Sequence, residues 1–568
     1  MTPKNYKSKD LNSLRIIPIG GCEEVGRNMT IFEYNKDIVI LDMGLQFPEE
    51  DMPGIDYVIP NIEYLKGRER DIQGVVFSHG HLDHIGAAPI LLKKLGYPII
   101  IGRPLTIEMI KHRQEEIEKG SSKQLKTIYI ERINDKIRLG SFEISFFPVD
   151  HAIMDAMGTV IKTPVATVIH PGDWKIETNP VGREKLDYSY LSKLEKPTVL
   201  MLESLGAINT KENITEEEML KNLHHLIDSA PGRIIVATFS SQLERIKQIL
   251  EYASKIGKKV ALDGFSMKLN VEIAKKLGYI KPAKGTIIPI NKIKDYPDNK
   301  IIIICTGSQG EEMSALARIV SGNHRFISLK KSDTVIFSSS IIPGNERTIQ
   351  RLKDNVYRLC DYVYHNEIMA VHISGHSSRE NIKEILDQIK PTYFIPVYAN
   401  HFMLKEAAKI AYEMGFPKNR VFVPDNGSII QFSKNEAKML KEKVPTNYVF
   451  VDGLGVGDVG EIVLRDRKVL ARDGMFVIIA VVNSKTGRVK GSPDIISRGF
   501  IYLKESKELL AETRRRTISI INKATEHSQE GGTINWDYVK EEVRNKIGQF
   551  LFSKTERRPI ILPVIIKV

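Results

Sequence analysis

Residues 72–86 read Ile-Gln-Gly-Val-Val-Phe-Ser-His-Gly-His-Leu-Asp-His-Ile-Gly, and this stretch decides the fold. Its first six residues are mostly apolar and predict a buried strand. His79, His81, Asp83 and His84 follow within six residues, in the turn that leaves this strand. Imidazole and carboxylate groups are ligands of zinc and manganese, and loops at strand ends commonly carry site residues. The H-x-H-x-D-H pattern therefore predicts a metal site.

Other predicted strand ends carry the further ligands that a pair of metal ions needs. His151 follows the strand-like run Phe142–Val149, and Asp173 follows the apolar segment Val165–Ile169. Asp42 ends an earlier apolar run, and it is expected either to bind metal or to orient a ligand histidine. Together these residues predict one site built from several strand ends of an N-terminal domain.

Composition sets limits on the kind of protein. A chain of 568 residues is expected to hold more than one domain, and 42% hydrophobic residues suffice for packed cores. The net charge of +12 (82 basic minus 70 acidic residues) favours a polyanionic partner. Three cysteines without a pairing pattern predict reduced thiols and a cytoplasmic location. Neither a signal peptide nor a membrane span is expected, because the first ten residues are polar and no apolar stretch reaches about 20 residues.

The pattern changes near Thr215, which reads as the cap of a new helix. Beyond it, strand-like runs alternate with helical stretches such as Gln242–Lys255, which predicts a parallel α/β sheet. The predicted strands are 233–238, 259–262, 300–305 and 334–339. The C-terminal region predicts a small α/β unit with one helix over 505–522 and another that opens at Asn535.

The ordered series of strand-end ligands resembles that of the metallo-β-lactamase hydrolases. Glu203 and the motif His372–His376 look like the acidic and histidine motifs of the β-CASP nucleases within that fold. The segments 306–311, 343–346 and 451–496 resemble bacterial ribonuclease J. The resemblance runs from about residue 12 to the end of the chain.

The resemblance implies an α/β fold, a metallo-β-lactamase αββα sandwich with an inserted β-CASP parallel α/β domain and a small C-terminal α/β domain. The implied domains are 1–210 (metallo-β-lactamase, first part), 211–365 (β-CASP), 366–450 (metallo-β-lactamase, second part) and 451–568 (linker and oligomerisation domain).

The resemblance also assigns roles to the candidate ligands. It implies two divalent metal ions, zinc or manganese, with His79, His81 and His151 at the first, Asp83 and His84 at the second, and Asp173 bridging them. Three residues receive catalytic roles: Asp83 orients or deprotonates the attacking water, His376 stabilises the scissile phosphate or protonates the leaving oxygen, and Glu203 supports His84 or His376.

Substrate phosphate is expected at the turn formed by His372, Ile373, Ser374, Gly375 and His376. Glycine lets backbone amides approach an anion, and serine adds a hydroxyl donor. The turns that contain Ser240 and Ser308 are two further candidates for phosphate contact, or else plain strand–helix turns.

One position departs from the family pattern. Where the family has a metal-binding histidine in its last motif, this chain has Tyr398 within Pro396-Val397-Tyr398-Ala399-Asn400-His401. Three outcomes stay open from the sequence: water or nothing in the ligand's place, substitution by His401, or coordination by a tyrosine phenolate. Asn400 predicts a helix cap, which would place His401 at the start of a helix.

The sequence therefore predicts a metal-dependent ribonuclease that acts in RNA maturation and decay. By the resemblance it is a 5′→3′ exonuclease that prefers 5′-monophosphate ends and is also an endonuclease. The alternative is a weakly active or non-catalytic RNA-binding paralogue within a ribonuclease J complex, favoured by Tyr398. A thioester or lactam hydrolase on the same fold is disfavoured by the long insertion. RNA is the expected partner, together with a homodimer or homotetramer, alone or with a paralogous subunit, and no membrane.

Overall fold

The structure is a computed structural model that describes residues 12–49, 51–210, 214–311, 313–342, 344–434, 436–501, 506–527, 529–530 and 533–568. It forms two compact units. The larger comprises the described residues up to Phe47 together with Val58–Val449, and the smaller comprises Pro48–Tyr57 with Phe450–Val568. Within the described residues, none of the helices combines the length and apolarity that a bilayer crossing requires.

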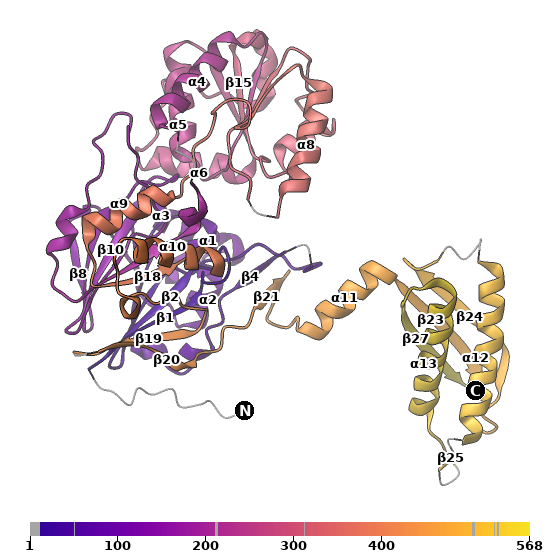
Figure 1. Ribbon diagram of the computed structural model, residues 1–568. Helices are drawn as coiled ribbons and strands as arrows, with labels where there is room; N and C mark the ends of the chain where they lie inside the picture. The colour runs from indigo at the N-terminus through magenta and orange to yellow at the C-terminus, as the bar shows by residue number, and fades with distance from the viewer. Residues whose placement is uncertain are drawn as a thin grey trace. The chain divides into compact units, whose positions relative to one another are not determined.

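Two stacked β-sheets form the centre of the larger unit (Figure 1). The first has the order β20-β19-β1-β2-β3-β5-β6-β7. Its strands are β1 (Leu14–Gly20), β2 (Met29–Tyr34), β3 (Asp37–Leu41), β5 (Ile72–Val76), β6 (Ile100–Gly102), β7 (Thr127–Tyr129), β19 (Ser428–Phe432) and β20 (Ala437–Lys443). The second has the order β18-β12-β11-β10-β9-β8. Its strands are β8 (Lys136–Leu139), β9 (Phe142–Pro148), β10 (Met157–Lys162), β11 (Thr167–His170), β12 (Thr198–Glu203) and β18 (Tyr393–Val397).

The main core lies between these sheets, because both turn apolar side chains inward. Phe32 and Val39 of the first sheet belong to the same buried cluster as Phe142, Met157 and Val199 of the second. Helices α9 (Arg379–Ile389) and α10 (His401–Glu413) contribute to a second cluster with the outer face of the second sheet. Helix α3 (Pro104–Ile117) contacts β6 and β7 of the first sheet, and α2 (Ala88–Lys94) packs against α3. The predicted αββα sandwich is confirmed.

A third sheet is inserted in the chain between β12 and β18. It has the all-parallel order β14-β15-β13-β16-β17. Its strands are β13 (Ile234–Ala237), β14 (Lys259–Asp263), β15 (Ile301–Cys305), β16 (Thr334–Phe337) and β17 (Tyr362–Tyr364). Its helices are α4 (Glu216–Ser229), α5 (Leu243–Lys255), α6 (Phe265–Lys276), α7 (Ala315–Val320) and α8 (Glu346–Leu359), and they surround the sheet in Figure 1. Every residue of β15 is buried, as expected for a parallel strand covered on both faces. The predicted parallel insertion is confirmed, and its limits at 211 and 365 stay a prediction.

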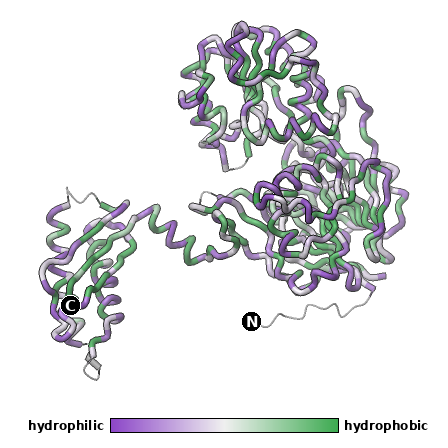
Figure 2. Tube along the Cα trace, turned by 180° about the vertical axis from the view of Figure 1, so that it is seen from behind, coloured by the Kyte–Doolittle hydropathy of each residue, from purple (hydrophilic) through white to green (hydrophobic). Residues whose placement is uncertain are grey.

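The smaller unit packs two helices on one face of a sheet with the order β24-β23-β27. Its elements are α11 (Glu461–Asp473), β23 (Met475–Val482), β24 (Val489–Arg498), α12 (Lys507–His527), α13 (Trp536–Thr555) and β27 (Ile560–Lys567), with the hairpin strands β21 (Val449–Asp452) and β22 (Gly455–Val456) before them. Burial alternates along β23, so one face enters the core and the other is partly exposed. Figure 2 shows both hydrophobic (green) and hydrophilic (purple) residues in this unit, and the apolar run of β23 is part of the green.

Local signals place several helix ends correctly. Thr215 caps α4 by accepting a hydrogen bond from the amide of Glu218, and Asn535 caps α13 in the same way through Tyr538. The helix predicted over 505–522 instead extends to His527, because Thr525 is buried and its hydroxyl bonds to the carbonyl of Gly487 at 3.1 Å. Residues 502–505 and Pro343 of the quoted motifs lie outside the described residues.

Candidate metal centre

The predicted ligands converge from four places in the chain. His79 and His81 lie in the turn after β5, and Asp83 and His84 lie in the short helix α1 (Leu82–Ile85) that follows. His151 comes just after β9 and Asp173 just after β11. They form two groups with mutually close ligand atoms: His79, His81, His151 and Asp173, and Asp83, His84 and Asp173. Asp173 belongs to both groups, as the bridging role requires.

Three imidazole nitrogens face one another in the first group. The Nδ1 atom of His81 lies 3.1 Å from Nε2 of His79 and 2.9 Å from Nε2 of His151. Burial lowers the pKa of His79 and His81 well below the usual range, with the neighbouring histidines adding to the effect. Burial likewise lowers the pKa of His151 to about 3. The three rings are therefore neutral at pH 7.

In two of these rings, His151 and His79, the Nδ1 nitrogen is engaged in a hydrogen bond. His151 donates from Nδ1 to the carbonyl of Gly375 at 2.7 Å, and Nδ1 of His79 lies 3.0 Å from the hydroxyl of Ser78. Their Nε2 atoms consequently carry lone pairs that point into the group. These nitrogens and the Asp173 carboxylate lie within 4.8 Å of one another, and such a donor set fits a divalent ion.

His84 anchors the second group through a buried carboxylate. Its Nδ1 donates to Asp42 at 2.8 Å, and its Nε2 lies 3.2 Å from Asp173 and 3.5 Å from Asp83. Asp42 also accepts the amide and the hydroxyl of Ser78, at 2.8 and 2.9 Å. Of the two roles predicted for Asp42, this geometry favours orientation of a ligand histidine.

His401 does not join these groups, whereas the ring of Tyr398 lies beside the second, with its centroid 5.5 Å from that of His84. Tyr398 is buried, and its hydroxyl has no hydrogen-bond partner among the described residues. Burial, together with the charge of Asp42, raises the pKa of this phenol well above its usual value, which disfavours a phenolate. His401 begins α10, as the cap at Asn400 predicted, and its Nδ1 lies 3.2 Å from Asp425 on the surface. The histidine substitution is therefore not supported.

His376 and Glu203 lie together beside the bridging carboxylate. The Nδ1 atom of His376 is 3.8 Å from both Asp173 and Glu203. Burial, and then the charge of Asp173, raises the pKa of Glu203 well above its usual value. Of the two partners predicted for Glu203, the contact found is the one to His376.

The motif His372–His376 touches the first group through its backbone. A side chain at Gly375 would place its Cβ 2.8 Å from Cβ of Ala152 and 3.1 Å from Cε1 of His151, so only glycine fits there. Ser374 closes the turn by accepting the amide of His376 at 3.1 Å, while Ile373 beside it is half-buried. His372 is different, because its ring is buried and burial lowers its pKa well below the usual range.

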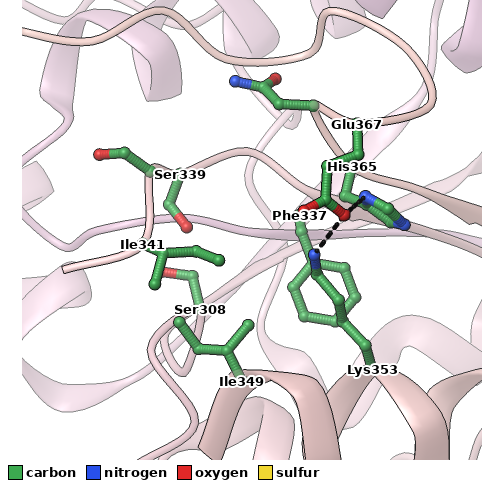
Figure 3. Close-up of a pocket in the computed structure, with 10 residues that line it drawn as sticks. Ser308, Phe337, Ser339, Ile341, Ile349, Lys353, His365 and Glu367 are labelled. Atoms are coloured by element: carbon green, nitrogen blue, oxygen red, sulfur yellow. Dashed lines mark hydrogen bonds and ion pairs between the residues drawn. The ribbon is translucent and has the colours of Figure 1, made fainter. Parts of the chain in front are cut away.

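The two serine candidates do not reach the metal groups. The carbonyl of Ser240 accepts the side-chain amide of Asn270 at 2.9 Å. Ser308 lines a cavity of about 220 Å³ inside the inserted domain (Figure 3). In that cavity Glu367 pairs with Lys353 at 3.2 Å and with His365 at 3.0 Å.

Two residues next to the site were not predicted. Asn28 lies just before β2, and its side-chain nitrogen is 2.9 Å from Nε2 of His84. Arg245 is buried in α5 and donates to the hydroxyl of Ser338 at 2.9 Å and to the carbonyl of Val371 at 3.0 Å, just before the phosphate motif. Asn28 follows a glycine-rich segment, residues 20–27, whose sequence gives no sign of a role at a metal site.

Comparison with known proteins places this site in a family. Family profiles match three parts of the chain: the metallo-β-lactamase superfamily over residues 23–182, the ribonuclease J β-CASP domain over 231–356 and the ribonuclease J C-terminal domain over 462–568. Ribonuclease J 1 of Streptococcus pyogenes serotype M3 is 37% identical over 561 residues, which is 98% of each chain. The chain belongs to the ribonuclease J family.

Other ribonuclease J proteins are similar to this chain over nearly its whole length. Ribonuclease J2 of Bacillus subtilis is 33% identical over 99% of this chain and 100% of that protein. Ribonuclease J 2 of Staphylococcus aureus (strain MRSA252) is 35% identical over 99% of each chain. A crystal structure of a protein of unknown function from Enterococcus faecalis V583 matches 75% of this chain and 100% of its own, with a TM-score of 0.53 and 17% identity, which supports the fold alone. As a ribonuclease J family member on a metallo-β-lactamase fold, the chain is a hydrolytic nuclease that binds divalent metal.

Proposed function

We propose that this nuclease degrades RNA from the 5′ end, prefers 5′-monophosphate termini, and also cleaves internally, in RNA maturation and decay. The observation that carries the proposal is the hydrogen bond of 2.7 Å from His151 to the carbonyl of Gly375. It joins a ligand of the first metal group directly to the turn proposed for phosphate. A phosphate held at that turn lies one residue from His376 and next to the metal groups, as removal of a terminal nucleotide requires.

The residues around the site divide the chemistry among them. Two divalent ions held by the two groups would lower the pKa of water and neutralise charge on phosphate oxygens. Asp83, the most exposed of the second group at 36% for its side chain, is placed to orient the attacking water or take its proton. His376 is placed to donate to the leaving oxygen. Glu203, 3.8 Å from Nδ1 of His376, is placed to orient the His376 ring.

Zinc and manganese are both proposed as the working metals. The first group offers three nitrogens and one carboxylate, a donor set that suits zinc and is acceptable to manganese. The second group is richer in oxygen, which favours manganese.

The preference for the 5′ end is tested on two RNAs of one sequence, one with a 5′-monophosphate and one with a 5′-triphosphate. Decay rates are measured side by side with Mn²⁺ and with Zn²⁺. The proposal expects faster decay of the monophosphorylated RNA and release of mononucleotides. Equal rates, or faster decay of the triphosphorylated RNA, would refute the preference. A circular RNA of the same sequence measures internal cleavage alone.

A weakly active or non-catalytic RNA-binding paralogue is the second candidate, and Tyr398 is the observation that favours it. A buried neutral phenol replaces the histidine that the family pattern has at this position. If the protein is such a paralogue, it binds RNA, but the RNA decays slowly at every metal concentration. Restoration of fast decay by Tyr398→His would support it.

Self-association through the smaller unit is also proposed, as a homodimer or homotetramer, alone or with a paralogous subunit. Leu562, Val564 and Ile566 of β27 are each more than 40% exposed, on the sheet face opposite the two helices. Apolar stripes of this kind mark interaction surfaces.

A cytoplasmic location is proposed as well, since the three cysteines are free and buried.

A further inference from the structure

Asn28 contacts the metal-facing atoms of the second group. Its side-chain nitrogen lies 2.9 Å from Nε2 of His84 and 3.3 Å from Oδ2 of Asp83. Ligands about 2.1 Å from one ion, at 90–110° to each other, lie roughly 3.0–3.4 Å apart. The distances from Nε2 of His84 to Asp173 and Asp83, 3.2 and 3.5 Å, fall near the same range. The side-chain nitrogen of Asn28 therefore lies at the spacing that a fourth ligand would have.

The backbone fixes Asn28 in this place. The backbone N–H of Asn28 donates to the backbone carbonyl of Asp83 at 3.0 Å. The backbone carbonyl of Asn28 accepts the backbone N–H of Gly44 at 2.9 Å. Gly44 is required for this approach, because a Cβ there would lie 1.5 Å from the carbonyl oxygen of Asp83. Asn28 is only 3% exposed, so its side chain has little freedom to turn toward solvent.

The side-chain oxygen of Asn28 is buried, and none of the described residues forms a hydrogen bond with it. A buried acceptor without a partner is destabilising. The two ends of a carboxamide have nearly the same shape and exchange by a half-turn of the group. A half-turn would bring the unpaired oxygen to the position between His84 and Asp83 that the nitrogen holds here.

We propose that Asn28 is the fourth ligand of the second metal site, where its carboxamide oxygen takes the place left by Tyr398. Without an ion, the side-chain nitrogen of Asn28 lies against Nε2 of His84. With an ion, Nε2 of His84 binds the metal, the carboxamide of Asn28 turns, and its oxygen binds the same ion. The completed site has oxygens from Asp83, Asp173 and Asn28 and one nitrogen from His84, a set that suits Mn²⁺.

The inference rests on the metal centre of the proposed function, but its test reads metal binding rather than RNA decay. Metal-free parent, Asn28→Ala and Asn28→Asp are titrated with Mn²⁺ by calorimetry, and bound Mn²⁺ is counted by electron paramagnetic resonance. Asn270→Ala, which removes another buried amide of the larger unit, is the matched control.

The two Asn28 variants separate a ligand from a structural hydrogen bond. Neither alanine nor aspartate can donate to His84, but aspartate still offers an oxygen. The inference expects two ions in the parent, in Asn270→Ala and in Asn28→Asp, and an at least tenfold weaker second ion in Asn28→Ala. Equal binding in the parent and Asn28→Ala would overturn it, as would a second ion lost equally from both variants. A parent that binds a single ion would also overturn it. RNA decay without metal dependence would instead count against the proposed function.

Discussion

Replacing Asp42 with asparagine should weaken the second metal ion without disturbing the first. The Asp42 carboxylate accepts three hydrogen bonds, from Nδ1 of His84 and from the amide and hydroxyl of Ser78. A carboxamide has one oxygen and one NH₂ group, so it cannot accept all three. If its oxygen keeps the amide of Ser78, its nitrogen faces Nδ1 of His84.

A donor facing Nδ1 forces the proton of His84 onto Nε2, the atom that must bind the metal. Loss of the partner that orients a ligand histidine typically lowers metal affinity by about 10- to 100-fold. This corresponds to about 1.4–2.7 kcal/mol. Charge-assisted hydrogen bonds are also lost from a buried site, so the free energy of unfolding of the metal-free protein should fall by about 1–3 kcal/mol.

Calorimetric titration of metal-free Asp42→Asn with Mn²⁺ measures both sites. The matched control is Asp37→Asn, at the start of the strand that precedes Asp42, because Asp37 accepts the amide and hydroxyl of Ser141 at 2.9 and 2.6 Å and no hydrogen bond joins it to a histidine among the described residues. We expect the control to bind both ions as the parent does. Parental affinity for both ions in Asp42→Asn would refute the reasoning, because the orientation of His84 would then not depend on this carboxylate.

Further changes test the turn, the inserted domain and the thiols. Gly375→Ala should lower kcat/KM on RNA by roughly 5- to 150-fold, because its Cβ would press on His151 and overpacking costs about 1–3 kcal/mol; unchanged kcat/KM would contradict the placement of the turn. Asp333→Ala should destabilise the inserted domain by about 3–5 kcal/mol in urea unfolding, because it leaves Arg233 buried without its partner. Asp298→Ala, which removes an exposed ion pair, should cost less than about 1 kcal/mol in the same assay. The three cysteines are buried with raised thiol pKa values, so Ellman's reagent should label all of them in guanidinium and none in the folded protein.

Residues whose signal is local in sequence were predictable. The histidines after β5 lie within six residues of one another, and an apolar run before them marks the strand that holds them. Strand ends likewise marked His151 and Asp173, and helix caps marked Thr215 and Asn535. Each of these signals depends on hydrogen bonds or burial within a few residues of the chain.

Residues whose role depends on distant packing were not predictable. Asn28 reaches the site only because its backbone pairs with Asp83, 55 residues away, across a glycine that admits the contact. The segment 48–57 belongs to the smaller unit through ion pairs and hydrogen bonds to residues some 400 positions later, such as Asp51 with Lys468 at 2.6 Å. The composition of segment 48–57 does not indicate that its partners lie in the C-terminal part of the chain.

The central claim is that RNA cleavage depends on divalent metal held by these histidines and aspartates. The most direct measurement compares the parent with Asp83→Ala on 5′-monophosphorylated RNA, in metal-free buffer and after addition of Mn²⁺. The side chain of Asp83 is 36% exposed, so the variant should keep the parental unfolding temperature. The account predicts cleavage by the parent only with added metal and none by Asp83→Ala. Cleavage by the variant at the parental rate, or by the parent in excess chelator, would contradict it.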